Sequence, residues 1–268
     1  MNRHWQWWAL LWLLLGSWPA MAAGAGERED WAELFRQAGV SGTLAVVDHR
    51  SAGPQTWYHN QARAGRRYSP ASTFKIPHTL FALDAGLVAS EFDVLPWDGE
   101  DRGMETWNRN QTLRSAMTHS VVWVYEGFAD VLGRDTERYY LNLVDYGNAN
   151  PDGATPAFWI DGELAVSADE QLDFLQRLYR NRLPFLERHQ RLVRDLMISA
   201  AGPEWRLRSK TGWDGERGWW VGWIEWPDGP VFFALHIDMP NGLADLPKRR
   251  QLVREALGTL SAWPEGVE

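Results

Sequence analysis

The pair Ser72 and Lys75 has the residue types and the spacing of a nucleophile and its base. A serine hydroxyl is a weak nucleophile until a neighbouring base takes its proton, and a desolvated lysine can act as that base. Residues three apart lie on the same face of a helix, close enough for a hydroxyl and an amine to interact. Because a Ser-x-x-Lys spacing also arises by chance in most proteins, the pair alone is only a hypothesis.

The scarcity of lysine in this chain strengthens the hypothesis. Of the 27 Lys and Arg residues, only Lys75, Lys210 and Lys248 are lysines, so arginine carries the ordinary surface charge. An arginine cannot be deprotonated in a protein, whereas a lysine can shift its pKa or be covalently modified. A lysine at an apolar helix start therefore indicates chemistry.

The segment from Tyr68 to Gly86 must position this pair. Pro70 precedes the expected start of a helix, and Gly86 stands where that helix should stop. A serine near a helix N-terminus faces unpaired backbone N–H groups, which favour negative charge and could stabilise an oxyanion. His78 lies on the same helix, and we interpret it as a packing or surface residue rather than a base.

The N-terminus predicts a signal peptide over residues 1–22. Arg3 and His4 precede an apolar run from Trp7 to Leu15, and the small-residue signal Ala20-Met21-Ala22 follows. The apolar run is too short to span a bilayer. We therefore expect a mature chain, residues 23–268, that is secreted to the periplasm and has no membrane association after signal cleavage.

Composition and motif searches exclude several function classes. The 268 residues include no cysteine and carry a net charge of −8 at pH 7. No disulfide or thiolate metal site can form, and the acidic balance argues against nucleic acid as a partner. The histidines are scattered, with neither H-E-x-x-H nor G-x-S-x-G, so a zinc hydrolase and a Ser-His-Asp hydrolase are disfavoured. We expect no metal.

Hydrophobic patterns place strands at both ends of the chain and helices in the middle. The expected strands are 42–48, 55–60, 205–209, 218–226 and 231–238; the expected helices include 30–37, 112–118, 121–132, 139–145, 186–197, 246–260 and one that opens with a capping box at 167–170. This arrangement predicts an α+β domain. Its sheet part would span about 23–76 and 205–268, with a helical part of about 77–204 between them.

Three further motifs could line the same site as Ser72. Lys210-Thr211-Gly212 follows an expected strand, where a lysine and a hydroxyl could hold a carboxylate and a glycine could let a ligand approach the backbone. Local structure offers another explanation for each motif. Lys210-Thr211-Gly212 could be a strand-end turn, Ser120 could cap the helix that begins at Val121, and Tyr146-Gly147-Asn148 could end a helix in a turn.

Taken together, the motifs resemble the signature of the class D (OXA-type) serine β-lactamases. They are Ser72-Thr73-Phe74-Lys75, Ser120-Val121-Val122, Tyr146-Gly147-Asn148 and Lys210-Thr211-Gly212. The middle S-x-V motif differs from the S-D-N of class A enzymes and penicillin-binding proteins. The stretches TFKIPHTLFALDAG, TLRSAMTHSVV, FWIDGELAVSADEQ, GWWVGW and DMPNGLADLPKR extend the resemblance over essentially the whole mature chain.

The resemblance implies a fold and an activity. The fold would be that of serine β-lactamases and penicillin-binding proteins, a mainly antiparallel sheet flanked by helices with a mostly helical subdomain. The activity would be hydrolysis of the β-lactam ring of penicillins and related antibiotics, which gives antibiotic resistance.

The resemblance also implies a role for each motif residue. Ser72 would be acylated, and Lys75 would react with CO2 to form N6-carboxylysine, an anionic base for acylation and deacylation, with no other cofactor. Carbamylation needs a neutral amine, and apolar surroundings lower the pKa of a lysine. The remaining implied residues are Phe74, Val122 and Trp159 around the carbamate; Ser120 and Lys210 as proton relay; the backbone N–H groups of Ser72 and Trp213 as oxyanion hole; Thr211, Gly212 and Arg249 for binding the substrate; and Trp107, Tyr146 and Asn148 along the cleft.

Two departures from the family pattern and three alternatives remain. Trp123 stands where many relatives have proline, and Ile160 where leucine is common; both bear on substrate range and deacylation rate. The alternatives are a penicillin-binding transpeptidase or carboxypeptidase, the sensor domain of a β-lactam receptor, and an inactive relative. The sequence leaves open the β-lactam spectrum, carbapenems included, and whether the protein is a monomer or a homodimer.

Overall fold

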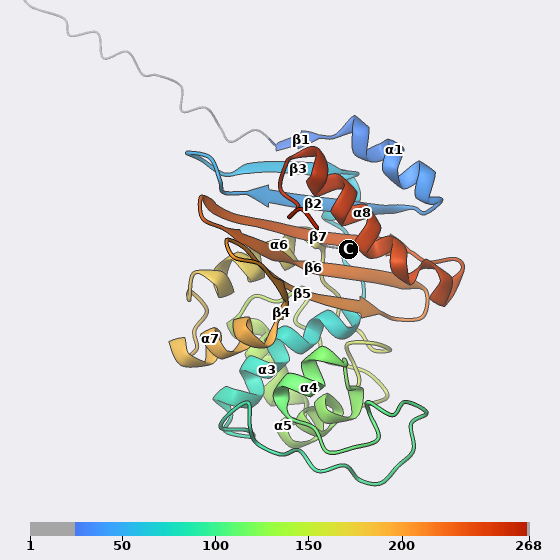
Figure 1. Ribbon diagram of the computed structural model, residues 1–268. Helices are drawn as coiled ribbons and strands as arrows, with labels where there is room; N and C mark the ends of the chain where they lie inside the picture. Colours follow the sequence, from blue (N-terminus) through green and yellow to red (C-terminus); the bar gives the residue numbers. More distant parts are fainter. Residues whose placement is uncertain (1–24, 267–268) are drawn as a thin grey trace, which may run out of the picture.

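The computed structural model describes residues 25–266, which form one β-sheet with helices around it (Figure 1). The expected signal peptide, residues 1–22, lies outside the described residues. In chain order the elements are β1 (Ala25–Glu27), α1 (Glu29–Ala38), β2 (Gly42–Asp48), β3 (Gln55–His59), α2 (Gln61–Ala64), η1 (Ala71–Phe74), α3 (Lys75–Asp84), α4 (Leu113–Thr118), α5 (Val122–Leu143), α6 (Ala168–Tyr179), α7 (Glu187–Leu196), β4 (Ile198–Ala201), β5 (Arg206–Trp213), β6 (Arg217–Trp226), β7 (Gly229–Asp238), η2 (Gly242–Asp245) and α8 (Leu246–Thr259).

The two ends of the chain build a single seven-stranded sheet in the order β1-β3-β2-β7-β6-β5-β4. All neighbouring strands are antiparallel except β1, which runs parallel to β3. The N-terminal and C-terminal strands meet where β2 pairs with β7, from Gly42 opposite Ile237 to Asp48 opposite Val231. The expected antiparallel pairs around residues 42–60 and 218–238 are confirmed.

Alternating side chains divide the core into two layers, one on each face of the sheet, because successive residues of a strand point to opposite faces. On β2 and β7, Leu44 and Phe233 face the cluster that contains α1 and α8, including Trp31. Their neighbours Ala45 and Phe232 face the other cluster, which contains α6 and the helical region. The sheet is therefore covered on both faces, by α1 and α8 on one side and by α6 and the helical region on the other.

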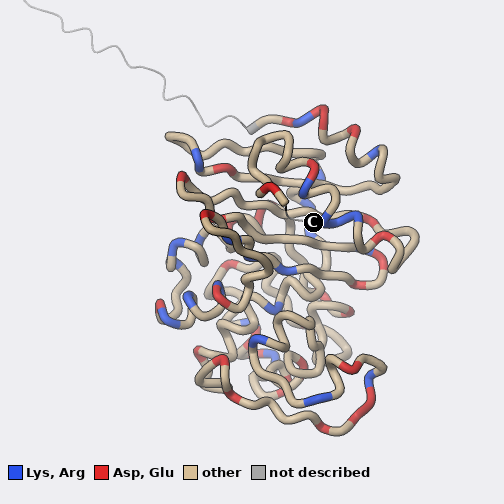
Figure 2. Tube along the Cα trace, viewed as in Figure 1, with Lys and Arg blue, Asp and Glu red and all other residues tan. Residues whose placement is uncertain are grey.

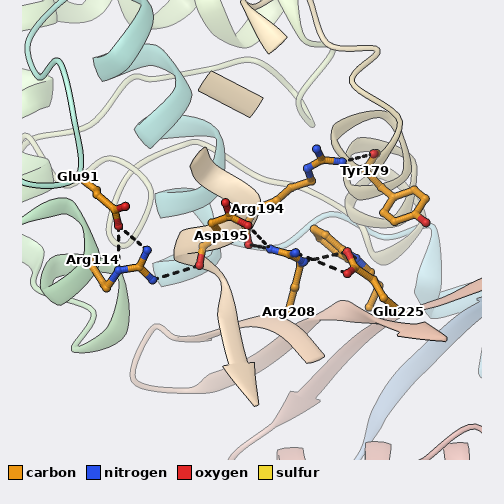
Figure 3. Close-up of polar contacts among 8 residues, drawn as sticks. Glu91, Arg114, Tyr179, Arg194, Asp195, Arg208 and Glu225 are labelled. Carbon is orange, nitrogen blue, oxygen red and sulfur yellow. Dashed lines mark hydrogen bonds and ion pairs between the residues drawn. The ribbon is translucent and has the colours of Figure 1, made fainter. Parts of the chain in front are cut away.

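Arginine side chains tie the helical region to the β4–β5–β6 side of the sheet (Figure 3). Arg208 on β5 donates to Asp195 at 2.9 Å and to Glu225 at 2.8 Å, and it also donates to the carbonyl of Arg194. Arg114 on α4 donates to the carbonyl of Asp195 at 3.2 Å. These contacts join α4, α7, β5 and β6 near the start of β5. Elsewhere, basic and acidic segments are interspersed along the chain (Figure 2).

The segment that carries Ser72 folds as a tight turn followed by a helix. Pro70 directly precedes the 3₁₀ turn η1, which contains Ser72, and α3 then begins at Lys75. Gly86 follows the helix with a φ of 72°, a left-handed conformation that suits glycine. The expected limits at Pro70 and Gly86 are therefore confirmed, with the first turn narrower than an α-helix.

Two expected limits were wrong, the end of one strand and the start of one helix, and two short strands were not predicted. The strand expected at 205–209 continues to Trp213, so Lys210, Thr211 and Gly212 belong to β5 itself. The helices expected at 121–132 and 139–145 form one element, α5, kinked at Gly133, whose φ of 73° and ψ of 160° are not helical. The short strands β1 and β4 carry too few residues for a period to be recognised.

The capping box at the start of α6 is confirmed and predicts a measurable stability effect. Ser167 Oγ accepts from the Glu170 backbone N–H at 3.2 Å, and Glu170 Oε2 accepts from the Ser167 N–H at 2.8 Å. We expect Ser167→Ala to lower the free energy of unfolding by about 1 kcal/mol, because one orphan donor loses its partner. Urea unfolding measures this, with exposed Ser51→Ala as the control; equal loss in both variants would contradict the cap.

Candidate active site

Ser72 and Lys75 meet as their spacing predicts. Lys75 Nζ lies 3.1 Å from Ser72 Oγ, within hydrogen-bonding distance. Lys75 is fully buried, whereas Ser72, the second residue of η1, is partly exposed. A nucleophile must be accessible to its substrate, and its base can be buried beside it. The partly exposed hydroxyl of Ser72 and the buried amine of Lys75 have this arrangement.

The surroundings of Lys75 favour its neutral form. Burial holds the pKa of this amine well below its ordinary value, the nearby charge of Lys210 lowers it further, and Glu126 opposes both. The aromatic rings of Tyr125 and Trp159 have their centres 5.1 and 5.9 Å from Nζ. Because a charged ammonium is costly in such a pocket, Lys75 is available as a base or as a nucleophile near neutral pH.

Two long-range hydrogen bonds hold the nucleophile turn in place. Ser69 Oγ donates to the carbonyl of Trp159 at 2.8 Å, and Trp219 Nε1 on β6 donates to the carbonyl of Ser69 at 2.8 Å. Ala71, directly before Ser72, has a φ of 46°, which is uncommon for a residue with a side chain. The turn is thus fixed from both sides in a strained conformation, as often happens at functional sites. Ser69 lies in the Tyr68–Gly86 segment and Trp219 in the GWWVGW stretch, but the sequence pattern predicted no role for either residue.

Ser120 and Lys210 form the second polar pair. Lys210 Nζ donates to Ser120 Oγ at 3.0 Å and to the carbonyl of Thr211 at 3.1 Å. Ser120 lies between α4 and α5 with a φ of 57° and does not cap the helix, because Val121 is the N-cap residue and provides no side-chain cap. Burial and the charge of Arg249 lower the pKa of Lys210 to about 7. The side chain of Ser120 is therefore engaged in a hydrogen bond with Lys210 and not in capping a helix.

Strand β5 approaches the nucleophile turn closely at Gly212. A Cβ at this position would lie 3.0 Å from the carbonyl oxygen of Pro70 and 3.3 Å from the backbone nitrogen of Ser72. The next residue, Trp213, ends β5 and is about one-third exposed. The backbone N–H groups of Ser72 and Trp213 therefore come from adjacent segments, which suits a shared oxyanion hole.

Arg249 on α8 reaches the same strand from the other layer. Its Nη1 donates to the carbonyl of Gly212 at 2.6 Å, and its Nε donates to the carbonyl of Leu246 at 3.2 Å. Burial and the neighbouring Arg250 lower the pKa of Arg249 to about 10, so it remains charged at neutral pH. Its Nη2 forms no hydrogen bond within residues 25–266, which leaves a donor near Thr211 for an anionic group.

The residues around Lys75 fit a carbamate. Trp159 is fully buried, and its Nε1 has no hydrogen-bond partner in the described part of the chain. An orphaned buried N–H is uncommon, and this one is free to donate to an acceptor in the pocket. Phe74 packs 5.6 Å from the Trp159 ring, and Val122 at the start of α5 contacts the same apolar cluster. The pocket thus offers an uncharged amine, an apolar wall and one donor.

Tyr146-Gly147-Asn148 lies behind this wall. The Tyr146 ring is buried 5.8 Å from Phe74. Gly147 has a φ of 57°, and its Cβ would clash with the carbonyl of Ala165 at 2.1 Å. Asn148 is exposed, and its Nδ2 donates to the carbonyl of Glu163 at 2.7 Å. The structure therefore brings Tyr146 to the pocket, whereas the Asn148 side chain is hydrogen-bonded to Glu163 and Ala165 in the segment that follows Trp159.

Trp107 and Trp123 form a hydrogen-bonded pair that makes one rim of the candidate site, on the side of Ser120. Trp123 Nε1 donates to the carbonyl of Trp107 at 3.0 Å, and Trp107 Nε1 donates to the carbonyl of His119 at 3.0 Å. The Arg102 guanidinium lies 5.6 Å from the Trp123 ring centre. Trp123, the departure from the family pattern, thus holds Trp107 at the rim.

Neither of two hollows next to β5 or its turn to β6 contains the Ser72–Lys75 pair. A hollow of about 880 Å³ lies between the end of α1 and the β5–β6 turn, and none of the four motifs lines it. A smaller one of about 240 Å³ reaches Lys210 and Thr211 between β4 and β5. Within residues 25–266, no group of three or more His, Asp or Glu side chains is arranged to hold a metal ion.

Comparisons with known proteins agree with this geometry. The family description of the penicillin binding protein transpeptidase domain matches residues 38–258. The fold and the serine–lysine site thus define a member of the penicillin-recognising serine enzymes. Curated relatives include β-lactamase OXA-20 of Pseudomonas aeruginosa, 55% identical over 89% of this chain and 90% of its own, and OXA-2 of Salmonella typhimurium, 55% identical over 90% and 88%.

Solved structures narrow the class further. The class D β-lactamase FUS-1 (OXA-85) of Fusobacterium nucleatum subsp. polymorphum superposes with a TM-score of 0.83 and 33% identity, over 88% of this chain and 99% of its own. The class D enzyme YbXI from Nostoc gives 0.82 and 35%, over 86% and 98%. The chain belongs to the class D (OXA-type) β-lactamase family, and the expected fold is confirmed.

The close approach at Gly212 predicts a loss of acylation on substitution. In Gly212→Ala, the added methyl group must push β5 or the Ser72 turn by a few tenths of an ångström. We expect the rate of acylation by a chromogenic cephalosporin to fall about tenfold to a hundredfold, because small misplacements of reacting groups are costly. Single-turnover kinetics measure it. Gly258→Ala on α8, where nothing lies within 4 Å, is the control, and unchanged acylation in Gly212→Ala would refute the role of this contact.

The lowered pKa of Lys210 predicts a pH-dependent stability. Between about pH 7 and its ordinary pKa of 10.5, the unfolded chain binds a proton at Lys210 that the folded protein does not, so stability rises with pH. We expect Lys210→Met to reduce this slope by about 1.4 kcal/mol per pH unit. Urea unfolding from pH 7 to 9 measures it, with the partly exposed Lys248→Met as control. A slope equal to that of the wild type would contradict the assignment.

Proposed function

We propose that this class D enzyme hydrolyses the β-lactam ring of penicillins and related antibiotics through an acyl-enzyme on Ser72, and so gives antibiotic resistance. The observation that carries the proposal is the 3.1 Å contact between Ser72 Oγ and the buried Nζ of Lys75. Support comes from the family membership and from the second lysine, Lys210, at the same site.

In the proposed acylation, Ser72 Oγ loses its proton toward the Lys75 side chain and attacks the carbonyl carbon of the ring. The backbone N–H groups of Ser72 and Trp213 stabilise the negative charge that develops on the carbonyl oxygen. When CO2 is bound to Lys75 as N6-carboxylysine, it supplies an anionic base for acylation and deacylation. Trp159 Nε1 is the donor proposed to hold it, within the apolar wall of Phe74 and Val122.

Ser120 and Lys210 are proposed to deliver the proton that the departing ring nitrogen needs. A lysine with a pKa of about 7 can give up and regain a proton at neutral pH, and Ser120 Oγ lies 3.0 Å from it. Thr211 and Arg249 would bind the carboxylate of the substrate, beside Gly212. Trp107 would line the cleft, with Tyr146 and Asn148 in supporting positions.

Further proposals concern the export of the protein, the division of its chain and its partners. We propose export to the periplasm after removal of residues 1–22, with the mature chain divided into a sheet part (about 23–76 and 205–268) and a helical part (about 77–204). Within residues 25–266, no helix has the length and apolar character needed to cross a membrane. The proposed partners are β-lactams alone, without nucleic acid or a metal, in a monomer or a homodimer.

One experiment tests the hydrolytic reaction against its alternatives. Purified mature protein is mixed with a chromogenic cephalosporin, with and without added bicarbonate. We expect sustained turnover that increases with bicarbonate, because the base at Lys75 requires CO2. A single stoichiometric burst would instead indicate a transpeptidase or a sensor domain, which stays acylated.

A substitution tests the assigned base. Lys75→Ala should abolish the bicarbonate dependence and lower turnover by about 10²- to 10⁴-fold, the usual contribution of a general base. Lys248→Ala, which removes a lysine paired with Asp245 on α8, is the matched control. Near-normal turnover in Lys75→Ala would refute the assignment.

A further inference from the structure

His78 and Glu137 form a buried ionisable pair next to the proposed base. His78 Nε2 and Glu137 Oε1 lie 2.7 Å apart, and their side chains are 0% and 1% exposed. His78 lies one turn after Lys75 on α3, and Glu137 follows the kink of α5 at Gly133. The kink changes the direction of α5 before Glu137, so the second half of this helix places the carboxylate against α3.

This pair is a poor way to gain stability. Neither ring nitrogen of His78 and neither carboxylate oxygen of Glu137 has a hydrogen bond of good geometry among residues 25–266, although Nε2 and Oε1 lie within ion-pair distance. A buried ion pair with unsatisfied atoms can often be replaced by apolar residues at no cost in stability. Buried unsatisfied groups in a native protein therefore need another explanation, and a functional role is one.

His78 contacts both aromatic rings that surround the Lys75 amine. Its ring centre lies 5.3 Å from that of Trp159, close to edge-on, and 5.7 Å from that of Tyr125. These are the rings whose centres lie within 6 Å of Lys75 Nζ. The imidazole also packs 5.0 Å from Phe74. His78 therefore supports the wall of the Lys75 pocket.

The charge of the pair matters as well as its shape. The imidazole of His78 faces the carboxylate of Glu137 across 2.7 Å, with both side chains out of contact with water. Without His78, an ionised Glu137 would stand unneutralised behind the aromatic wall. A buried anion favours the charged ammonium of a nearby lysine, and the charged form cannot react with CO2.

Other charged groups face this region from each neighbouring element. Lys210 on β5 favours a neutral Lys75, and Glu126 on α5 favours a charged one. Asp130, Arg134 and Glu137 line a hollow of about 310 Å³ with the 154–158 segment. Arg134 Nη2 donates to the carbonyl of Gly153 at 3.1 Å, so this guanidinium is engaged with that segment. The imidazole of His78 is therefore the group placed to neutralise Glu137.

We propose that His78, held by Glu137, is a positioning residue that fixes Tyr125 and Trp159 around Lys75 and sets the affinity of Lys75 for CO2. The inference rests on the proposed carbamylation of Lys75. In that reaction the neutral Nζ forms a bond to the carbon of CO2 and releases one proton to solvent. The two side chains act on this equilibrium through the shape and the charge of the pocket.

Titration with ¹³C-bicarbonate tests the proposal without relying on turnover. NMR of the mature protein at pH 7 reports the labelled carbamate and the bicarbonate concentration at half-saturation. We expect this concentration to rise about tenfold in His78→Gln, which corresponds to about 1.4 kcal/mol in the free energy of carbamate formation. We expect about a threefold rise in Glu137→Gln, where the imidazole loses its anchor but no charge is left behind. The double variant should return to the Glu137→Gln value.

A matched control separates this effect from general destabilisation. Asp48→Asn breaks a largely buried ion pair with Arg50, 2.7 Å long, at the end of β2, and should leave half-saturation unchanged. Wild-type affinity in both single variants would overturn the proposal. If His78→Gln fails to fold, unchanged affinity in Glu137→Gln alone overturns it. A double variant as weak as His78→Gln would overturn the electrostatic part. No labelled carbamate in the wild type would refute carbamylation itself, which is a distinct result.

Discussion

The burial of the Lys75 amine is the constraint on which the rest of the site depends. Removing this group from water makes the neutral amine the favoured form, and the charge of Lys210 acts in the same direction. The neighbours must then be large and apolar, yet able to satisfy a polar group in the pocket. Phe74 and Trp159 meet both needs, since an indole provides a hydrophobic face together with one N–H donor.

The site also requires that β5 and the turn that carries Ser72 pack together with almost no space between them. Gly212 permits the approach because it has no side chain, and Trp219 and Ser69 fix it through a hydrogen bond between β6 and the nucleophile turn. Catalytic groups on strands and helices are held more tightly than groups on loops. The arginine contacts of Arg208 add a further tie between β5 and the helical region, on the side where Lys210 enters.

Sequence reasoning worked where the determinant is local and failed where it is distant. The Ser72–Lys75 contact follows from helical spacing, and the capping box at Ser167 follows from residue types three apart. The length of β5 did not follow, because Lys210, Thr211 and Gly212 are extended through pairing with β6 rather than by their own preference. The buried contact between His78 and Glu137 also had no signal, since it depends on the kink at Gly133.

The match to a transpeptidase domain spans residues 38–258, a range that includes the proposed nucleophile Ser72, the proposed base Lys75 and the proposed proton donors Ser120 and Lys210. Hydrolysis needs one thing more, a base that can activate water while Ser72 is acylated. In the proposed carbamylated state, the anionic group on Lys75 would supply that base, and it would also offer an acceptor to the Nε1–H group of Trp159. The unsatisfied Nε1 of Trp159 thus agrees with the proposal that Lys75 carries a carbamate.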